Sequence, residues 1–241
     1  MRLKITLDTK GQPVPFEYHG YLQGMIYHAL NDDTAEQLHD RGYGDDRIYK
    51  LFVFSELSGK YVIKNRSLVF TEPVRFYVSS VSSEMLNELY TFFNENEEVR
   101  FGRNMFDVVS AEPVREFGYN ENMEYRIRTI SPITAYKTDE KNYTTYFNPK
   151  SADFENSLHD NLRRKYVTCY GEELSAEDDI FEILDVEKSS KRISKYKETN
   201  YNAYMCVMRV KVSDTYLKLL MHTGLGASNS AGYGMMCIME R

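Results

Sequence analysis

The chain has few of the residues that would place it outside the class of ordinary folded domains. Of its 241 residues, only 6 are Pro, 13 are Gly and 3 are Cys, while 42% are hydrophobic and 27% are charged. A chain this poor in Gly and Pro is neither fibrous nor of low complexity, and one this apolar is not intrinsically disordered. Its apolar runs are far shorter than the ~20 residues that span a bilayer. We therefore expect a folded protein of one large or two small domains, with no membrane partner.

The cysteines indicate a reducing compartment. The chain has three cysteines, Cys169, Cys206 and Cys237, and this odd number argues against a disulfide framework. No Cys-x-x-Cys pair occurs, which argues against a zinc or redox site. The first residues, Met1 to Asp8, alternate like a strand, and no apolar core of a signal peptide follows them. No His-Glu-x-x-His motif is present either. We expect a cytoplasmic protein without a catalytic metal or cofactor.

The first half of the chain shows an alternation of strand and helix patterns. Leu22, Ile26 and Leu30 have the spacing of an amphipathic helix over 21–30. Asp33 and Glu36 suggest a capping box for a short second helix that stops at Gly42. A third helix begins at Ser82 or Ser83. Strand patterns are found at 3–8, 48–54, 60–63, 67–78, 99–101 and 105–112.

The second half repeats this order after a polar, Gly-containing and Asn-containing stretch at 116–122, the best linker candidate. Helices are predicted at 151–168 and between Ser213 and Gly224, and strands at 123–130, 179–188, 202–212 and 235–239. Each half thus has the order β-α-β-β-α-β, which forms a four-stranded antiparallel sheet with both helices on one face. We predict an α+β protein of two tandem ferredoxin-like (RRM-like) domains, over 1–118 and 122–241. This fold hosts many functions and does not fix one.

Positive charge gathers in one window of an acidic protein. Residues 187–211 hold seven basic side chains against Glu187 and Glu198, a balance of +5, whereas the whole chain carries -6. The seven are Lys188, Lys191, Arg192, Lys195, Lys197, Arg209 and Lys211. Such a strip can hold a polyanion locally; a solvated hairpin is the alternative. A second basic cluster, 163–165, lies in a predicted helix and is consistent with a solvated helix face.

A glycine-rich loop precedes the predicted last strand. Residues 224–234 read Gly-Leu-Gly-Ala-Ser-Asn-Ser-Ala-Gly-Tyr-Gly, which lets the backbone approach a ligand closely and aim N–H groups at phosphate oxygens. A helix stop followed by a turn is the alternative, although one glycine would suffice for it. The helix-loop-strand order excludes a dinucleotide fingerprint, and the absence of Gly-Lys-Ser/Thr excludes a Walker loop.

The segment Gly-Leu-Gly-x5-Gly-Tyr-Gly-Met resembles the glycine-rich signature of the repeat-associated mysterious protein superfamily. Within it, the chain resembles the CRISPR-associated endoribonucleases that process precursor CRISPR RNA. Similarity to that family's first helix and second strand is found in the N-terminal block 21–27, followed by His39 and by the block 50–55. Similarity to its central helix is found in the block 160–166 and in Tyr170-Gly171. The resemblance runs nearly from end to end. It implies CRISPR repeat RNA as the partner, and products with 2′,3′-cyclic phosphate and 5′-hydroxyl ends.

RNA is cut without a metal when its own 2′-hydroxyl attacks the adjacent phosphate. That reaction needs a base, an acid and a cation beside the phosphate. The residues that match the family's arrangement are Tyr27, His39 and Lys50. The resemblance gives Lys50 the transition-state role, while the base and acid are not assigned between Tyr27 and His39. His28, next to Tyr27, is the rival histidine.

For RNA binding, we predict phosphate contacts by Lys188, Lys191, Arg192, Lys195 and Lys197, and loop contacts by Gly224, Gly226, Ser228, Asn229, Ser230, Gly232 and Gly234. A non-catalytic RNA-binding subunit of a CRISPR effector complex is the alternative function, and the context of His39 favours the enzyme. An acylphosphatase-like enzyme would need an anion loop with an Arg, which is missing before residue 40. Association with other CRISPR effector proteins, and a homodimer, remain open.

Overall fold

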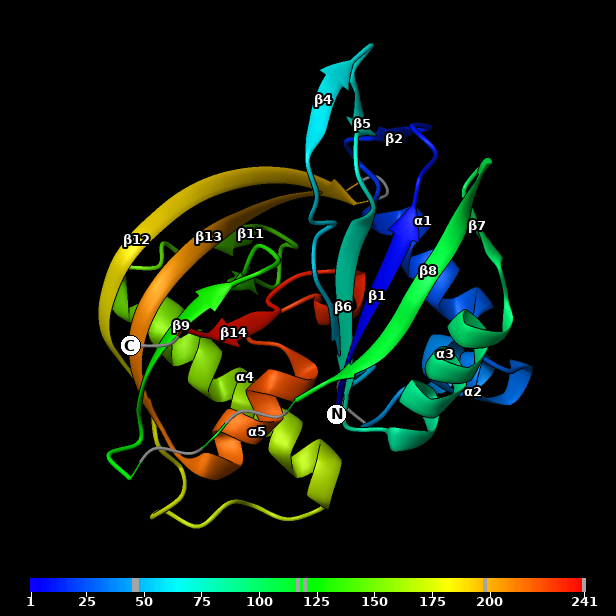
Figure 1. Ribbon diagram of the computed structural model, residues 1–241. Helices are drawn as coiled ribbons and strands as arrows, with labels where there is room; N and C mark the ends of the chain where they lie inside the picture. The colour runs from blue at the N-terminus through cyan, green and yellow to red at the C-terminus, as the bar shows by residue number, and fades with distance from the viewer. Residues whose placement is uncertain (45–47, 116–117, 119–120, 197–198, 240–241) are drawn as a thin grey trace.

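A computed structural model describes the chain except residues 45–47, 116–117, 119–120, 197–198 and 240–241. Its first half is built on an antiparallel five-stranded sheet in the order β3-β6-β1-β8-β7 (Figure 1). The strands are β1 (Arg2–Asp8), β3 (Phe52–Phe54), β6 (Val74–Ser80), β7 (Glu98–Phe101) and β8 (Asn104–Val114). Helices α1 (His19–His28) and α3 (Ser83–Glu95) contribute to the core on one face of this sheet.

The second half contains a four-stranded antiparallel sheet in the order β12-β13-β9-β14. Its strands are β9 (Glu124–Thr129), β12 (Phe181–Tyr196), β13 (Thr199–Val212) and β14 (Met236–Ile238), with helices α4 (Ala152–Tyr170) and α5 (Asp214–Thr223). In both halves the first and third strands of the β-α-β-β-α-β unit lie in the middle of the sheet, which is the ferredoxin-like order. The predicted fold class is confirmed.

Several short elements lie outside this scheme. They are β2 (Pro13–Pro15), β4 (Tyr61–Lys64), β5 (Ser67–Phe70), β10 (Tyr136–Thr138), β11 (Thr144–Tyr146), α2 (Asp32–Glu36), a π-helix (Gln37–Arg41) and a 3-10 helix (Asn229–Ala231). Strands β2, β10 and β11 were not predicted, because three residues are too few to show an alternating pattern. Strands β2, β5 and β4 form a small sheet of their own, and Figure 1 shows the β4–β5 hairpin projecting from the first half.

Several predicted boundaries were wrong; among them, the strand expected over 179–188 continues as β12 to Tyr196. The strand expected over 48–54 begins only at Phe52, because Leu51 has a positive φ of 51° that no extended strand allows. The strand expected over 67–78 is two strands, β5 and β6, which belong to different sheets. The short second helix is capped by Asn31 rather than Asp33, since the Asn31 side chain accepts a hydrogen bond from the Thr34 N–H at 2.8 Å.

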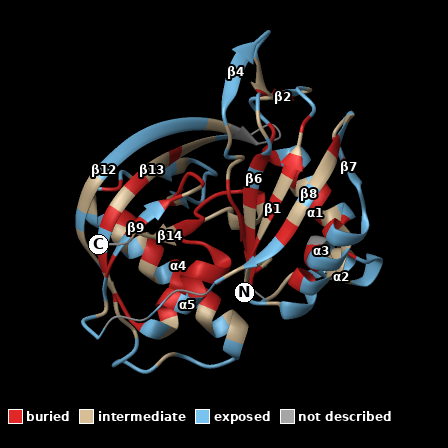
Figure 2. Ribbon diagram, in the orientation of Figure 1, coloured by how far each residue is buried: buried red, intermediate tan, exposed pale blue. Residues whose placement is uncertain are grey.

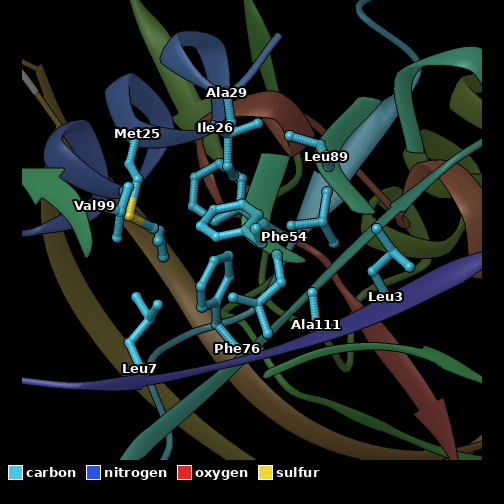
Figure 3. Close-up of a cluster of buried hydrophobic side chains, with 14 of the residues drawn as sticks. Leu3, Leu7, Met25, Ile26, Ala29, Phe54, Phe76, Leu89, Val99 and Ala111 are labelled. Carbon is cyan, nitrogen blue, oxygen red and sulfur yellow. The ribbon is translucent and has the colours of Figure 1, made fainter. Parts of the chain in front are cut away.

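Each half has its own hydrophobic core. In the first, alternate residues of β1, β3 and β6 meet apolar residues of both helices, as Figure 3 shows for Leu3, Ile26, Phe54, Phe76 and Leu89. In the second, α4 and α5 pack on β9, β12 and β13. Figure 2 shows that buried residues concentrate on the central strands and α5, whereas β4 is exposed along its length. Among the described residues, no helix combines the length and apolar character needed to cross a membrane.

The two halves are joined through the open face of the first sheet. Arg2 lies on β1 opposite the core residues, and its Nη2 donates to the carbonyls of Met221 on α5 at 2.9 Å and Met236 on β14 at 3.0 Å. Burial lowers the pKa of Arg2 to about 10. The Glu56 N–H donates to the Ile130 carbonyl at 3.0 Å. Helix α5 and strand β14 therefore pack against the first sheet. Most of the predicted linker at 116–122 lies outside the described residues.

Candidate functional site

The glycine-rich loop, residues 224–234, lies at this junction, and its glycines are required by packing. Gly224, Gly226, Gly232 and Gly234 have φ of 78°, 78°, 89° and 77°, a region that other residues rarely adopt. A Cβ on Gly226 would lie 2.5 Å from the Thr134 carbonyl oxygen, and one on Gly232 would lie 2.5 Å from the Phe54 ring. All four are buried. Contact of these glycines with RNA stays a prediction.

Contacts with two other parts of the chain fix the loop. Gln23 on α1 donates through Nε2 to the Ser230 carbonyl at 2.6 Å. The Tyr233 ring meets the ring of His19 with centroids 5.6 Å apart, and its hydroxyl donates to Ser194 Oγ on β12 at 2.8 Å. The loop thus contacts the first helix and the long β12–β13 hairpin, whose curve Figure 1 shows.

Lys165 on α4 binds the glycine-rich loop through hydrogen bonds. It is 2% exposed, and its Nζ donates to the Gly224 carbonyl at 2.8 Å and to Asn229 Oδ1 at 2.6 Å. Asn229 Nδ2 in turn donates to the Tyr233 carbonyl at 2.9 Å. The interpretation of 163–165 as a solvated face was therefore wrong for Lys165. Arg164 is exposed, and Arg163 forms an ion pair with Asp179.

Lys50 meets the glycine-rich loop across one cavity. The cavity has a volume of about 110 Å³ and is lined by residues 48–52, by α4 and by the loop. Lys50 lies in the segment that precedes β3, not at the start of a strand as predicted. Partial burial lowers the pKa of Lys50, while the charge of Asp40 acts in the opposite direction. A predicted catalytic cation and the predicted anion loop therefore share one site.

The helix that carries His39 lies beside Lys50. His39 belongs to the π-helix, whose last turn closes with the Gly42 N–H donating to the Gln37 carbonyl at 2.6 Å. Tyr43 and Tyr49 then exchange backbone hydrogen bonds of 2.7 and 2.8 Å, and a Cβ on Gly42 would lie 3.4 Å from Lys50 Cδ, so the end of the π-helix lies beside Lys50. The side chain of His39 is outside what the structure describes, so its role stays a prediction.

Tyr27 and His28 point to different elements. The Tyr27 ring lies edge-on to Phe52, two residues after Lys50, with centroids 5.9 Å apart. Tyr27 is half-buried. The His28 ring instead meets Phe92 on α3 at 6.1 Å. Tyr27 thus contacts a residue that lines the Lys50 cavity, Phe52, but Tyr27 is not itself among the described lining residues.

The basic strip is divided between the two faces of its hairpin. Lys188 and Arg192 pair with Val207 and Ala203 of β13, which point away from the helices, whereas Lys191 pairs with Tyr204 on the helix side. Lys188, Lys191 and Arg192 are exposed. Arg192 is close enough to Glu56 to oppose the rise in the pKa of Glu56 that burial causes. The Lys195 side chain and all of Lys197 lie outside the described residues.

Two residues of the cavity were missed by sequence reasoning. Asn161 and Lys165 both line it from α4. They lie in the block 160–166 that resembles the family's central helix, but no motif marked either one, because their role depends on a loop about 60 residues away in the sequence. Within the described residues, no group of three or more His, Cys, Asp or Glu side chains is placed to hold a metal ion.

Comparison with known proteins identifies the family of the chain. The family model for the C-terminal part of CRISPR-associated protein Cas6 matches residues 111–238, and the model for its N-terminal part matches residues 13–112. The CRISPR-associated endoribonuclease Cas6 1 of Methanocaldococcus jannaschii is 27% identical, over 100% of this chain and 93% of its own length. The endoribonuclease Cas6 of Pyrococcus furiosus is 28% identical, over 92% of this chain and 83% of its own length.

The fold agrees with this match. A solved structure of a Cas6-related protein from Pyrococcus furiosus superposes with a TM-score of 0.85 at 21% identity, covering 100% of this chain and 99% of the other. The two family models together span the glycine-rich loop, the His39 helix and the Lys50 cavity. The resemblance predicted from the sequence is confirmed: the chain belongs to the Cas6 family of CRISPR-associated proteins.

Proposed function

We propose that the chain is a metal-independent endoribonuclease that binds CRISPR repeat RNA and cuts precursor CRISPR RNA within each repeat. The observation that carries this proposal is the cavity in which Lys50 faces the glycine-rich loop, with the His39 helix alongside. The curated relatives are named endoribonucleases, which supports an RNA substrate.

The proposed chemistry follows from the groups around the cavity. Lys50 supplies the positive charge for the phosphate as its negative charge grows during attack by the 2′-hydroxyl. Tyr27 and His39 supply the base for that hydroxyl and the acid for the departing 5′-oxygen. The RNA is left with a 2′,3′-cyclic phosphate on one side and a 5′-hydroxyl on the other.

Cleavage is expected to survive removal of divalent ions. The purified protein, incubated with labelled repeat RNA in EDTA, should produce one cut per repeat, because the attacking group and the proposed catalysts belong to the RNA and the chain. The end groups are checked by testing the upstream product for resistance to phosphatase until acid opens the cyclic phosphate. RNA that is bound but never cut would remove the enzyme proposal and favour the non-catalytic subunit.

Binding is expected to depend on Lys188 and Arg192, two exposed side chains on the same face of the hairpin. Each phosphate contact with single-stranded RNA contributes roughly 0.7 to the slope of log affinity against log salt. The double variant Lys188→Gln/Arg192→Gln should therefore lower that slope by roughly 1.4. The control Lys150→Gln/Arg164→Gln removes two exposed cations at or beside α4. Equal slopes for both doubles would rule out the hairpin face as the phosphate surface.

We further propose that the two ferredoxin-like units, each with its own sheet and core, divide as 1–118 and 122–241. The first then carries the catalytic set, and the second carries the basic hairpin and the glycine-rich loop. We propose the cytoplasm as the place of action, since that is where a transcript substrate is found.

A further inference from the structure

Asn161, which lines the Lys50 cavity, has a buried polar atom without a hydrogen bond. Asn161 on α4 is 4% exposed, and no described residue donates to its Oδ1. Asn161 lines the same cavity as Lys50 and the glycine-rich loop. Because buried polar atoms in native proteins are almost always paired, an unpaired acceptor beside a cavity indicates that a donor arrives there with a ligand or with water.

The other walls of the cavity suit an anion. Lys50 and Lys165 bring two positive charges, Ser228 and Ser230 bring hydroxyl groups, and none of the described lining residues is an Asp or Glu. Lys165 is held against the loop by its bonds to Gly224 and Asn229, so its charge is fixed at the base of the cavity. A ligand that matches these walls carries negative oxygens at one end and a hydrogen-bond donor at the other.

The size of the cavity limits what can enter. Its volume of about 110 Å³ exceeds the share of one water, about 30 Å³, but it cannot take a helix or a duplex. A phosphate with part of its nucleotide has both required ends, because the phosphate is anionic and the ribose hydroxyl or the base edge donates.

We propose that this cavity is a subsite for the phosphate and an adjoining part of one nucleotide of the bound RNA, in which Lys50 and the loop hydroxyls contact the phosphate and Asn161 Oδ1 accepts a hydrogen bond from the ribose or base. This proposal rests on the proposed function and adds a specificity residue to it. Asn161 is a binding residue here, because it contacts the substrate and takes no part in proton transfer.

The test compares Asn161→Leu with Asn156→Leu in the full chain. Leu has nearly the shape of Asn but no acceptor, and Asn156 is exposed on the same helix. Loss of one hydrogen bond should weaken repeat RNA binding by about 3- to 10-fold in Asn161→Leu, measured in EDTA with the His39→Ala background to prevent cutting. Asn156→Leu should bind as its parent does.

Thermal unfolding separates a binding role from a structural one. Because Oδ1 has no partner in the folded protein, its replacement by an apolar group should leave the melting temperature unchanged or raise it. A lower melting temperature together with unchanged RNA affinity would overturn the subsite and leave Asn161 as a packing residue. Unchanged affinity at unchanged stability would show that only water fills the cavity, and this also overturns the proposal.

The RNA group that donates the hydrogen bond to Asn161 Oδ1 is identified by substituting the RNA one position at a time. If the ribose donates, one 2′-deoxy position should weaken binding to the parent protein by the factor seen for Asn161→Leu, and the variant should be insensitive at that position. If a base donates, a base analogue that lacks one N–H should show this pattern instead. A scan in which neither series contains such a position would overturn the proposal.

These outcomes are independent of those for cleavage. A parent protein that binds repeat RNA but never cuts it contradicts the endoribonuclease proposal, while the affinity ratio of Asn161→Leu still decides the subsite. Normal cutting by the parent protein, together with equal RNA affinities for Asn161→Leu and its parent, supports the endoribonuclease proposal and overturns the subsite. A parent protein that binds no RNA would overturn both.

Discussion

The variant His39→Ala should cut repeat RNA about 10²- to 10⁴-fold more slowly than the unaltered protein, the range that a positioned acid or base contributes. Its RNA affinity should be nearly unchanged, because the proposed phosphate contacts come from Lys50, the glycine-rich loop and the β12–β13 hairpin. Single-turnover cleavage with excess protein measures the chemical step, and a filter or gel assay measures binding.

His28→Ala is the matched comparison for His39→Ala. Both variants remove one imidazole from the first half, but His28 meets Phe92 on α3, whereas the His39 helix lies beside the Lys50 segment. His28→Ala should therefore keep its cleavage rate. Loss of cutting in His28→Ala with a normal rate in His39→Ala would exchange the two assignments, and normal rates in both would remove these two histidines from the mechanism.

The elements of both halves were predicted well where local chemistry decides them. Ser82 and Ser213 accept hydrogen bonds from the N–H groups of Met85 and Tyr216 at 3.1 and 3.3 Å, and so begin α3 and α5 as expected. The alternation of β1 identifies its buried side through Leu3, Ile5 and Leu7. These patterns depend on neighbours in the sequence, which is why the order of elements and hence the fold class followed from them.

The site was predicted less completely because it is made by distant contacts. Lys165 looks like a member of a basic, solvated cluster until the glycine-rich loop is placed over it. Asn161 has no motif around it and gains its significance from a cavity formed by three separate segments. Leu51 breaks a β-like run through its positive φ, which hydropathy cannot reveal. The catalytic set came from family resemblance, which located Lys50 and the loop but not the residues between them.

Substitution of Gly234 should damage the fold itself rather than RNA contact alone. An Ala at this position must adopt a φ of 77°, which costs about 1–2 kcal/mol for a residue with a Cβ. Its Cβ would also overlap the backbone carbonyl oxygen of Leu225, which a side-chain rotation cannot relieve, and forced overpacking adds about 1–3 kcal/mol. We expect Gly234→Ala to lose about 2–5 kcal/mol of its free energy of unfolding in urea.

Gly171→Ala is the control that separates backbone strain from overlap. Gly171 ends α4 with a φ of 75°, and a Cβ there would meet nothing within 4 Å. It should therefore lose only the strain of about 1–2 kcal/mol, so the difference between the two variants measures the overlap at Leu225. If Gly234→Ala were as stable as Gly171→Ala but failed to bind repeat RNA, the glycine would be needed for the ligand. Equal stability with normal binding would mean that the loop shifts to accept a side chain.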